Sequence, residues 1–411
     1  MEDHIKKTVL SNGLTIVTEH IPSVKSVTAG IWVKSGARHE TKQQAGVTHF
    51  LEHMLFKGTK NRTAFEIAQS MESVGGYLNA FTSTEYTCYY ARCLDSELHT
   101  ALDVLSDMVM NPVFPKDEIE KEKKVVIEEM KMYRDSPDDY LFEEFTSHLF
   151  KDHPLGRPIL GYEESVSAFT DDDLFQYMRD RYAPKNLIIA VAGKVDHDTV
   201  LRYCQSVLVT EDRKLVEPLN EELSPLDTTP LSLTKSIEQT HYIWGRRGLH
   251  FDDDQKYVLL LTNTLLGGGM SSRLHQNIRE KYGYCYSIQT FNQSFLETGI
   301  WGVYAGTDTE YVKHVHELVV EQLNLLAHQE LANKELTEAK AQLKGKLLLS
   351  QENTSNRMMR LAKSEIYYKR HVDLDELVEH IDSVSVEDII SFAKDFMNES
   401  EFVEAKLTPK E

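Results

Sequence analysis

Two histidines and a glutamate form the strongest chemical signal in the sequence. His49 and His53 are four residues apart, and Glu52 lies between them. On an α-helix, residues four apart sit about 40° apart around the axis and about 6 Å along it. Both imidazoles would therefore project from one face, at a separation that lets them share one metal ion, with Glu52 on the same side.

The residues around this motif predict that its helix is buried. Most residues from 45 to 56 are apolar, among them Phe50, Leu51 and Met54, and a helix that is apolar on nearly all sides is buried. Three ionisable groups on one arc of such a helix are costly unless they are paired or bind a metal. The alternative is that the histidines are hydrogen-bonded core residues, because a chain with 17 histidines can contain this spacing by chance.

A second predicted helix, at residues 115 to about 133, could supply a third metal ligand. Its expected apolar arc consists of four residues: Ile119, Val125, Val126 and Met130. Glu122 and Glu129 fall inside this arc, about 20° apart and two turns separated. Two carboxylates in a buried stripe predict a cation that meets them. An inward salt bridge to Arg or Lys is the alternative.

In these residues the sequence resembles the inverzincin metallopeptidases of the pitrilysin and insulin-degrading-enzyme type. The resemblance is closest to the two-domain branch that includes the mitochondrial processing peptidase β subunit and its bacterial relatives. Residues 49–59, His-Phe-Leu-Glu-His-Met-Leu-Phe-Lys-Gly-Thr, match that branch almost letter for letter. Glu129 follows His53 at the interval where the family places its third zinc ligand, and Glu122 occupies the position of the family's accessory carboxylate.

The resemblance implies a zinc endopeptidase. One Zn²⁺ per chain would be held by His49, His53 and Glu129, with one position left open for water. Glu52 would take a proton from the water that zinc activates, as this water attacks a peptide carbonyl. Glu122 would orient a ligand or tune the charge from behind the ligands.

The second half of the chain carries a further catalytic pair that the resemblance implies. Arg279 and Tyr286, seven residues apart, match the family's Arg/Tyr pair near the zinc, which would stabilise the oxyanion. The family usually has Gly-Leu-Ala-Tyr here, whereas residues 283–286 are Gly-Tyr-Cys-Tyr. Tyr282 or Tyr284 therefore remains an alternative for the functional tyrosine, and a purely structural Arg and Tyr are the other alternative.

Other residues are expected to bind the substrate by the same resemblance. Asn79 and Ala80 lie in residues 78–83, which resemble the edge strand that accepts the substrate backbone. Strand addition selects extended or unfolded segments, so short or unstructured peptides are the expected substrates. Phe56 resembles the apolar wall for the residue after the scissile bond.

The charge of the chain agrees with basic peptides as substrates. Lys and Arg number 45 against 65 Asp and Glu, which gives a net charge of −20, and such a surface repels nucleic acid and anionic lipid. We therefore expect neither nucleic acid nor a membrane as a partner. Asp139 and Glu143 match carboxylates that hold a basic residue upstream of the cut in the processing peptidase. The alternative is that they are solvated residues of an acidic surface.

The composition also bears on compartment. Apolar residues make up 41% of the chain, as in a soluble globular protein, and no apolar run approaches the roughly 18 residues of a membrane span. The polar, acidic start is unlike a signal or transit peptide. The four cysteines are irregularly spaced, which is typical of buried thiols in a reducing compartment. We expect a cytoplasmic location.

The elements that must position these residues recur twice along the chain. In the first half we predict strands at 14–17, 27–33 and 187–191, a strand pair within 77–94, and helices from about 45, at 64–74, at 97–110 and at 115–133. In the second half we predict strands at 240–245, 284–290 and 300–305, and helices at 257–266, 273–281, 310–328 and 334–349.

This recurrence predicts an α+β fold of two topologically similar domains, each a mainly antiparallel sheet covered by helices. The expected division is a zinc-binding domain at 1–215, a Pro-containing linker at 216–232 and a second domain at 233–411 that carries the Arg/Tyr pair. In the family this pair comes from the half of a closed chamber opposite the zinc. The resemblance therefore implies a homodimer in which each chain completes the active site of its partner.

Two other functions stay open. Some members of the family are non-catalytic partner or scaffold subunits, and a third possibility is a protein that binds peptides without cutting them. The non-catalytic members have typically lost one or more of the motif residues, whereas this sequence retains every one of these residues. The enzyme is therefore the favoured interpretation.

Overall fold

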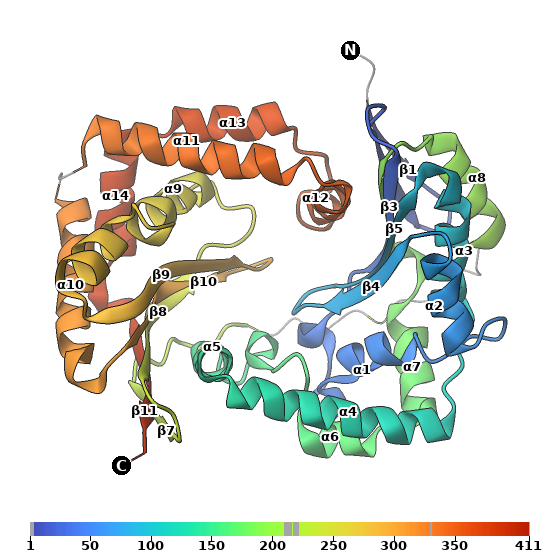
Figure 1. Ribbon diagram of the computed structural model, residues 1–411, viewed down its shortest axis with the longest axis horizontal. Coiled ribbons are helices and arrows are strands. Elements are labelled where there is room, and N and C mark those ends of the chain that lie inside the picture. Colours follow the sequence, from blue (N-terminus) through green and yellow to red (C-terminus); the bar gives the residue numbers. More distant parts are fainter. Residues whose placement is uncertain (1–3, 209–215, 217–221, 329–330, 411) are drawn as a thin grey trace. The chain divides into compact units, whose positions relative to one another are not determined.

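The computed structural model describes residues 4–208, Val216, 222–328 and 331–410 of the 411-residue chain. The chain forms two compact units, and each contains one β-sheet with helices packed on it (Figure 1). Among the described residues, no helix is both long enough and apolar enough to cross a membrane.

The first unit contains a six-stranded sheet. Its strands, in order across the sheet, are β1 (Ile5–Val9), β2 (Thr15–His20), β6 (Leu187–Gly193), β3 (Ser26–Val33), β5 (Thr87–Leu94) and β4 (Tyr77–Thr82). β2 and β6 are parallel, and the other neighbours are antiparallel. β4 forms one edge, with β5 as its neighbour.

The second unit repeats this topology with five strands. Their order is β7 (Leu231–Lys235), β11 (Val403–Pro409), β8 (Thr240–Gly248), β10 (Gly299–Thr307) and β9 (Cys285–Ser294). β7 and β11 are parallel and the rest antiparallel. These strands correspond one by one to β2, β6, β3, β5 and β4, with β1 as the extra strand. The predicted α+β duplication is therefore confirmed.

The helices follow the same repeat. In the first half they are α1 (Val47–Met54), α2 (Ala64–Glu72), α3 (Leu98–Met110), α4 (Lys116–Asp135), α5 (Pro137–Leu149), α6 (Glu163–Ala168), α7 (Asp171–Arg181) and α8 (His197–Val207). In the second half they are α9 (Lys256–Gly267), α10 (Val312–Ala327), α11 (Asn333–Ser350), α12 (Thr354–Tyr367), α13 (Leu374–Ser383) and α14 (Val386–Phe396). The predicted helices are confirmed within a few residues, except that the one at 273–281 is a π-helix over His275–Glu280. The sequence patterns did not identify α5 to α8, α12 to α14, β7 or β11.

Two helices cross between the halves of the chain. The first unit comprises Met1–Lys131, His153–Glu222 and Gln351–His371, and the second comprises Met132–Asp152, Leu223–Ser350 and Val372–Glu411. The α5 helix of the first half therefore packs on β8 and β11 of the second unit, while α12 packs on β2, β3 and β6 of the first. The expected division at 1–215 and 233–411 lacks this exchange, and the expected linker at 216–232 ends inside β7. Each crossing helix packs on the sheet of the other half: α12 residues share a buried cluster with Trp32 and Ile188 of the first sheet, and α5 contacts β8 and β11 of the second.

The two faces of the first sheet show why both layers are needed. On one face, Phe50, Leu51 and Met54 of α1 are fully buried in a large core that also contains Ala80 of β4. On the other face, Trp32 packs with residues of α12. The chemistry-bearing α1 helix is thus held against the sheet by its own apolar side.

Candidate metal centre

The α1 helix begins at a tight turn that only glycine fits. Gly46 has a φ of +89°, and a Cβ atom there would lie 2.4 Å from the carbonyl oxygen of Leu160. The carboxylate of Glu40 accepts hydrogen bonds from the backbone N–H groups of Gly46 (2.7 Å) and Thr48 (2.8 Å), which would otherwise lack partners at the start of the helix. Burial raises the pKa of Glu40 to about 8, although the hydrogen bonds from these donors act to lower it. No sequence pattern pointed to this role of Glu40.

His49, His53 and Glu129 bring one ligand atom each to a common point, within 4.8 Å of one another. Oε2 of Glu129 lies 3.8 Å from Nε2 of His49 and 3.6 Å from Nε2 of His53. Tetrahedral zinc with bonds of about 2.0–2.2 Å separates its ligand atoms by about 3.3–3.6 Å. The two distances to Glu129 are within a few tenths of an ångström of this separation, so two imidazoles and a carboxylate in this arrangement suit a zinc ion.

Burial keeps the first of these histidines in the form that binds metal. His49 is 8% exposed. Burial, and next the neighbouring His53, lowers the pKa of His49 to about 3, so that its imidazole is neutral at pH 7. Since the chain must deprotonate an imidazole before it can ligate a metal, this environment favours the ligand state.

Glu122 lies directly behind His53. Its Oε1 accepts a hydrogen bond of 2.8 Å from Nδ1 of His53, and its Oε2 forms an ion pair of 2.6 Å with Nζ of Lys57. Burial raises the pKa of Glu122, but the contacts with His53 and Lys57 outweigh burial and hold it below its ordinary value. The inward salt bridge considered as an alternative is thus present, with Lys57 as the partner, beside the contact expected of an accessory carboxylate.

The α4 helix supplies both carboxylates from one stripe. Glu122 is 4% exposed and Glu129 is half-buried, in line with Val126 and Met130. Val125 is 49% exposed, which corrects its expected place in the apolar arc. It lies one residue off a stripe whose members recur every three or four positions.

Glu52 points to the edge strand. Its Oε2 accepts a hydrogen bond of 2.6 Å from Oγ1 of Thr82, the last residue of β4. Burial raises the pKa of Glu52 above its ordinary value, and the bond from Thr82 opposes this shift. From sequence, Thr82 is expected only as part of the edge strand and Lys57 has no assigned role, because each lies far along the chain from the glutamate that it contacts.

Asn79 and Ala80 are neighbours on the edge strand β4, but their side chains lie in different environments. Asn79 is exposed, and its Oδ1 accepts a hydrogen bond of 2.9 Å from the backbone N–H of Ala80, while its Nδ2 donates to Oη of Tyr77. Ala80 is buried in the core shared with α1. Phe56, just after α1, is half-buried against the same core.

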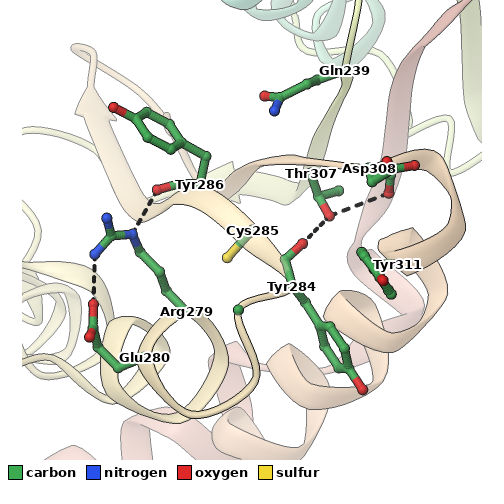
Figure 2. Close-up of a pocket in the computed structure, with 10 residues that line it drawn as sticks. Gln239, Arg279, Glu280, Tyr284, Cys285, Tyr286, Thr307, Asp308 and Tyr311 are labelled. Carbon is green, nitrogen blue, oxygen red and sulfur yellow. Dashed lines mark hydrogen bonds and ion pairs between the residues drawn. The ribbon is translucent and has the colours of Figure 1, made fainter.

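Arg279 and Tyr286 lie in the second unit, at a pocket of about 450 Å³ (Figure 2). Nε of Arg279 donates to the carbonyl oxygen of Tyr286 (2.8 Å), and its Nη1 donates to Glu280 (2.6 Å) and contacts Nε2 of His275 (3.1 Å). The guanidinium is therefore fixed by three contacts. It also fixes the backbone of the tyrosine with which it was paired by sequence.

Of the three candidate tyrosines, Tyr286 is the most exposed. Its side chain is 77% exposed. The ring of Tyr284 instead stacks between Tyr282 (5.3 Å) and Tyr311 (4.8 Å), as Figure 2 shows for Tyr311. This arrangement favours Tyr286 over the two alternatives.

Asp139 and Glu143 also lie in the second unit, because α5 crosses to it. They are one turn apart on α5, where Asp139 is exposed and Glu143 is half-buried. Burial, and next the charge of Glu144, raises the pKa of Glu143. The first unit therefore holds the candidate metal-ligating group, and the second unit holds both the Arg/Tyr pair and these two carboxylates.

The sequence and the fold can be compared with known proteins. Residues 15–163 match the family model described as insulinase (peptidase family M16), and residues 168–343 match the model described as peptidase M16 inactive domain. An uncharacterized zinc protease of Bacillus subtilis is 40% identical over 395 residues, which cover 96% of each chain. An uncharacterized zinc protease of Streptomyces coelicolor is 38% identical over 96% of this chain and 87% of its own.

Two solved structures share the fold along nearly the whole chain. A protease from Helicobacter pylori superposes with a TM-score of 0.90 at 22% identity and covers 98% of this chain and 99% of its own. A peptidase M16 inactive domain from Pseudomonas fluorescens has a TM-score of 0.92 at 19% identity, with coverage of 99% and 98%. With these matches along its length, the chain belongs to peptidase family M16, the pitrilysin family of zinc peptidases.

Proposed function

We propose that the protein is a zinc-dependent endopeptidase that hydrolyses short or unstructured peptides, with one Zn²⁺ per chain. The observation that carries this proposal is the convergence of His49, His53 and Glu129 beside the carboxylate of Glu52. It is the one such group of three potential ligands among the residues that the structure describes. The relatives' descriptions as zinc proteases support the choice of metal.

The residues divide the chemistry between them. Zinc held at this site would supply a Lewis acid that acidifies water and polarises a peptide carbonyl. Glu52 would take the proton of the attacking water at Oε1 and pass it to the leaving amine, because Oε2 is engaged by Thr82. Glu122 would hold the ring of His53 through Nδ1, which leaves Nε2 for the metal.

The free edge of β4 is the proposed docking site for the substrate backbone. Main-chain hydrogen bonds along Asn79 and Ala80 would bind any extended peptide, whereas a folded protein offers no free strand. Phe56 is the proposed apolar wall of the site. Asp139 and Glu143, with the net charge of −20, support a preference for basic peptides, and basic residues upstream of the cut would be the ones that they select.

The Arg/Tyr pair is proposed to stabilise the oxyanion from a second copy of the chain. Arg279 is pre-organised by its contacts with Glu280 and His275, and the exposed ring of Tyr286 is available to a ligand. A homodimer would bring this pair to the partner's zinc and close a chamber around both sites. A cytoplasmic location is proposed because all four cysteines are free and buried.

The test combines metal analysis with peptide cleavage. The purified protein should contain zinc near one ion per chain and should cut a quenched fluorescent peptide rich in Lys and Arg. The Glu52→Gln variant should retain zinc and lose about 10²–10⁴-fold in turnover, since it lacks the proton acceptor. Stoichiometric zinc without cleavage by the wild type would instead support a peptide-binding protein, and absence of zinc binding would overturn the proposal.

A further inference from the structure

The edge strand β4 has two distinct faces. Ala80 belongs to the core that contains α1, whereas Phe81 packs against Trp32 on the opposite face, with ring centroids 5.6 Å apart. Side chains alternate along a strand, so Thr82 shares the face of Ala80. This alternation brings the Thr82 hydroxyl to α1 at the level of Glu52, where the two side chains are joined by the bond of 2.6 Å.

We propose that Thr82 is a positioning residue for Glu52, so that the strand that docks the peptide also orients the proton acceptor. The inference rests on the proposed function and adds a residue to it. A glutamate side chain has several rotatable bonds, and Thr82 donates the one hydrogen bond that the described residues make to this carboxylate. With Oε2 held, Oε1 is directed and remains able to accept a proton.

Because Thr82 is the last residue of β4, its bond to Glu52 also links the proton acceptor to the strand that would dock the peptide. A peptide that pairs with the free edge of β4 fixes the register of its own backbone against that strand. The same strand fixes Glu52 through Thr82, so both the scissile bond and the proton acceptor would be positioned by β4. An error of about 1 Å in such positioning can cost about 10²-fold in rate.

This role predicts an effect on turnover and not on peptide binding. Thr82→Val keeps the branched shape but removes the donor, and it should lower kcat about 10–100-fold with KM within about 2-fold of the wild type. Thr82→Ser keeps the hydroxyl and should restore kcat to within about 3-fold. Zinc content and melting temperature should stay near the wild-type values in both variants, because Thr82 is only half-buried.

A double-mutant cycle separates positioning from a general structural effect. The shorter side chain of Glu52→Asp withdraws the carboxylate from Thr82, so Thr82→Val should cost little further in that background. A Thr82→Val effect of equal size in both backgrounds would overturn the inference. Thr28→Val is the control for the same substitution elsewhere, because it removes a threonine hydroxyl that is buried and bonded to Thr354 at 2.9 Å, away from the metal centre. It should lower the melting temperature and leave kcat unchanged.

The outcomes distinguish this inference from the proposed function. If the wild type cuts peptides and Thr82→Val cuts them equally well, the positioning role is wrong while the peptidase stands. If Thr82→Val raises KM and leaves kcat unchanged, Thr82 serves binding, and the inference is equally wrong. If the wild type binds zinc but cuts nothing, the proposed function fails before the variants are compared.

Discussion

Lys57 and Glu122 form an ion pair of 2.6 Å directly behind the candidate metal-ligating group. The second oxygen of the same carboxylate accepts the hydrogen bond from His53. A buried carboxylate without a partner would be costly, and Lys57 provides the counter-charge just after α1. The three side chains form a continuous chain of contacts from the half-buried Lys57 through Glu122 to His53, one of the candidate metal ligands.

Glu122→Gln should weaken metal binding about 10–100-fold, as is usual when the group that orients a ligating histidine is altered. The amide keeps the size of the side chain but cannot pair with Lys57 and His53 as a carboxylate does. Competition with a chromogenic zinc chelator measures the affinity. Glu128→Gln on the exposed side of the same helix is the control and should bind zinc as the wild type does. Equal zinc affinity in all three proteins would contradict the role given to Glu122.

Asn79→Ala should tighten peptide binding, because the Asn79 side chain now satisfies the N–H of Ala80 and must leave before a peptide carbonyl can accept from it. One hydrogen bond is worth about 0.5–1.5 kcal/mol, so KM should fall about 2–10-fold. Asn79→Asp retains the acceptor and should keep a KM near that of the wild type. Steady-state cleavage of the basic peptide measures both. A higher KM for the alanine variant would mean that Asn79 itself binds the substrate.

The parts of the site that the sequence predicts are those with local geometry. His49 and His53 are one turn apart on one helix, so their common face follows from helix pitch alone. Glu122 and Glu129 stand out because they break the apolar stripe of α4. In each case a single element contains the whole signal, and no knowledge of the tertiary fold is needed.

The contacts that the sequence does not predict join elements whose pairing depends on the tertiary fold. Thr82 reaches Glu52 only because β4 lies under α1, and Glu40 reaches the start of α1 through a turn. The packing of α5 and α12 on the sheet of the other half cannot be predicted from the sequence for a related reason. An amphipathic pattern shows that a helix buries one side, but both faces of both sheets are apolar, so the pattern does not say which sheet receives it.

Arg279→Lys should lower kcat about 10–100-fold, because an ammonium group cannot reproduce the planar fork that contacts Tyr286, Glu280 and His275 together. Tyr286→Phe should lower kcat in the same way, since it removes the exposed hydroxyl. The control is Tyr282→Phe, because that ring stacks on its neighbour and should leave kcat unchanged. Steady-state kinetics of the three variants measures kcat. A loss of kcat confined to Tyr282→Phe would contradict the role given to Tyr286.

Met358→Ala should destabilise the first unit, although Met358 lies in the second half of the sequence. Nε1 of Trp32 donates to Sδ of Met358 at 3.1 Å, and both side chains are fully buried. Truncation of a buried methionine costs about 2–5 kcal/mol. Hydrogen exchange should accelerate in β3 and β6, which α12 covers, and remain unchanged in β8 and β10. Acceleration confined to the second unit would contradict the exchange of helices.

Asp107 should make the stability of the folded protein depend on pH, because it anchors the loop after α1. Its carboxylate is 4% exposed and accepts hydrogen bonds from Thr59 (2.6 Å), Asn61 (2.6 Å) and Arg62 (2.7 Å). Burial raises the pKa of Asp107, but these donors outweigh burial and hold it below its ordinary value of 3.8. The unfolded chain therefore takes up a proton first as the pH falls. The stabilisation by Asp107 is present above about pH 4 and is lost as the pH drops through the lowered pKa.

Asp107→Asn removes this titration and should lower the melting temperature near pH 6, where the wild-type carboxylate is charged. The difference between wild type and variant should narrow steadily as the pH falls below about 4 and through the lowered pKa of Asp107, since the wild type then loses the same interaction. Melting curves of protein stripped of metal by a chelator measure this without a contribution from zinc release. A difference that stays constant across this range would show that Asp107 acts through its shape alone and not through its charge.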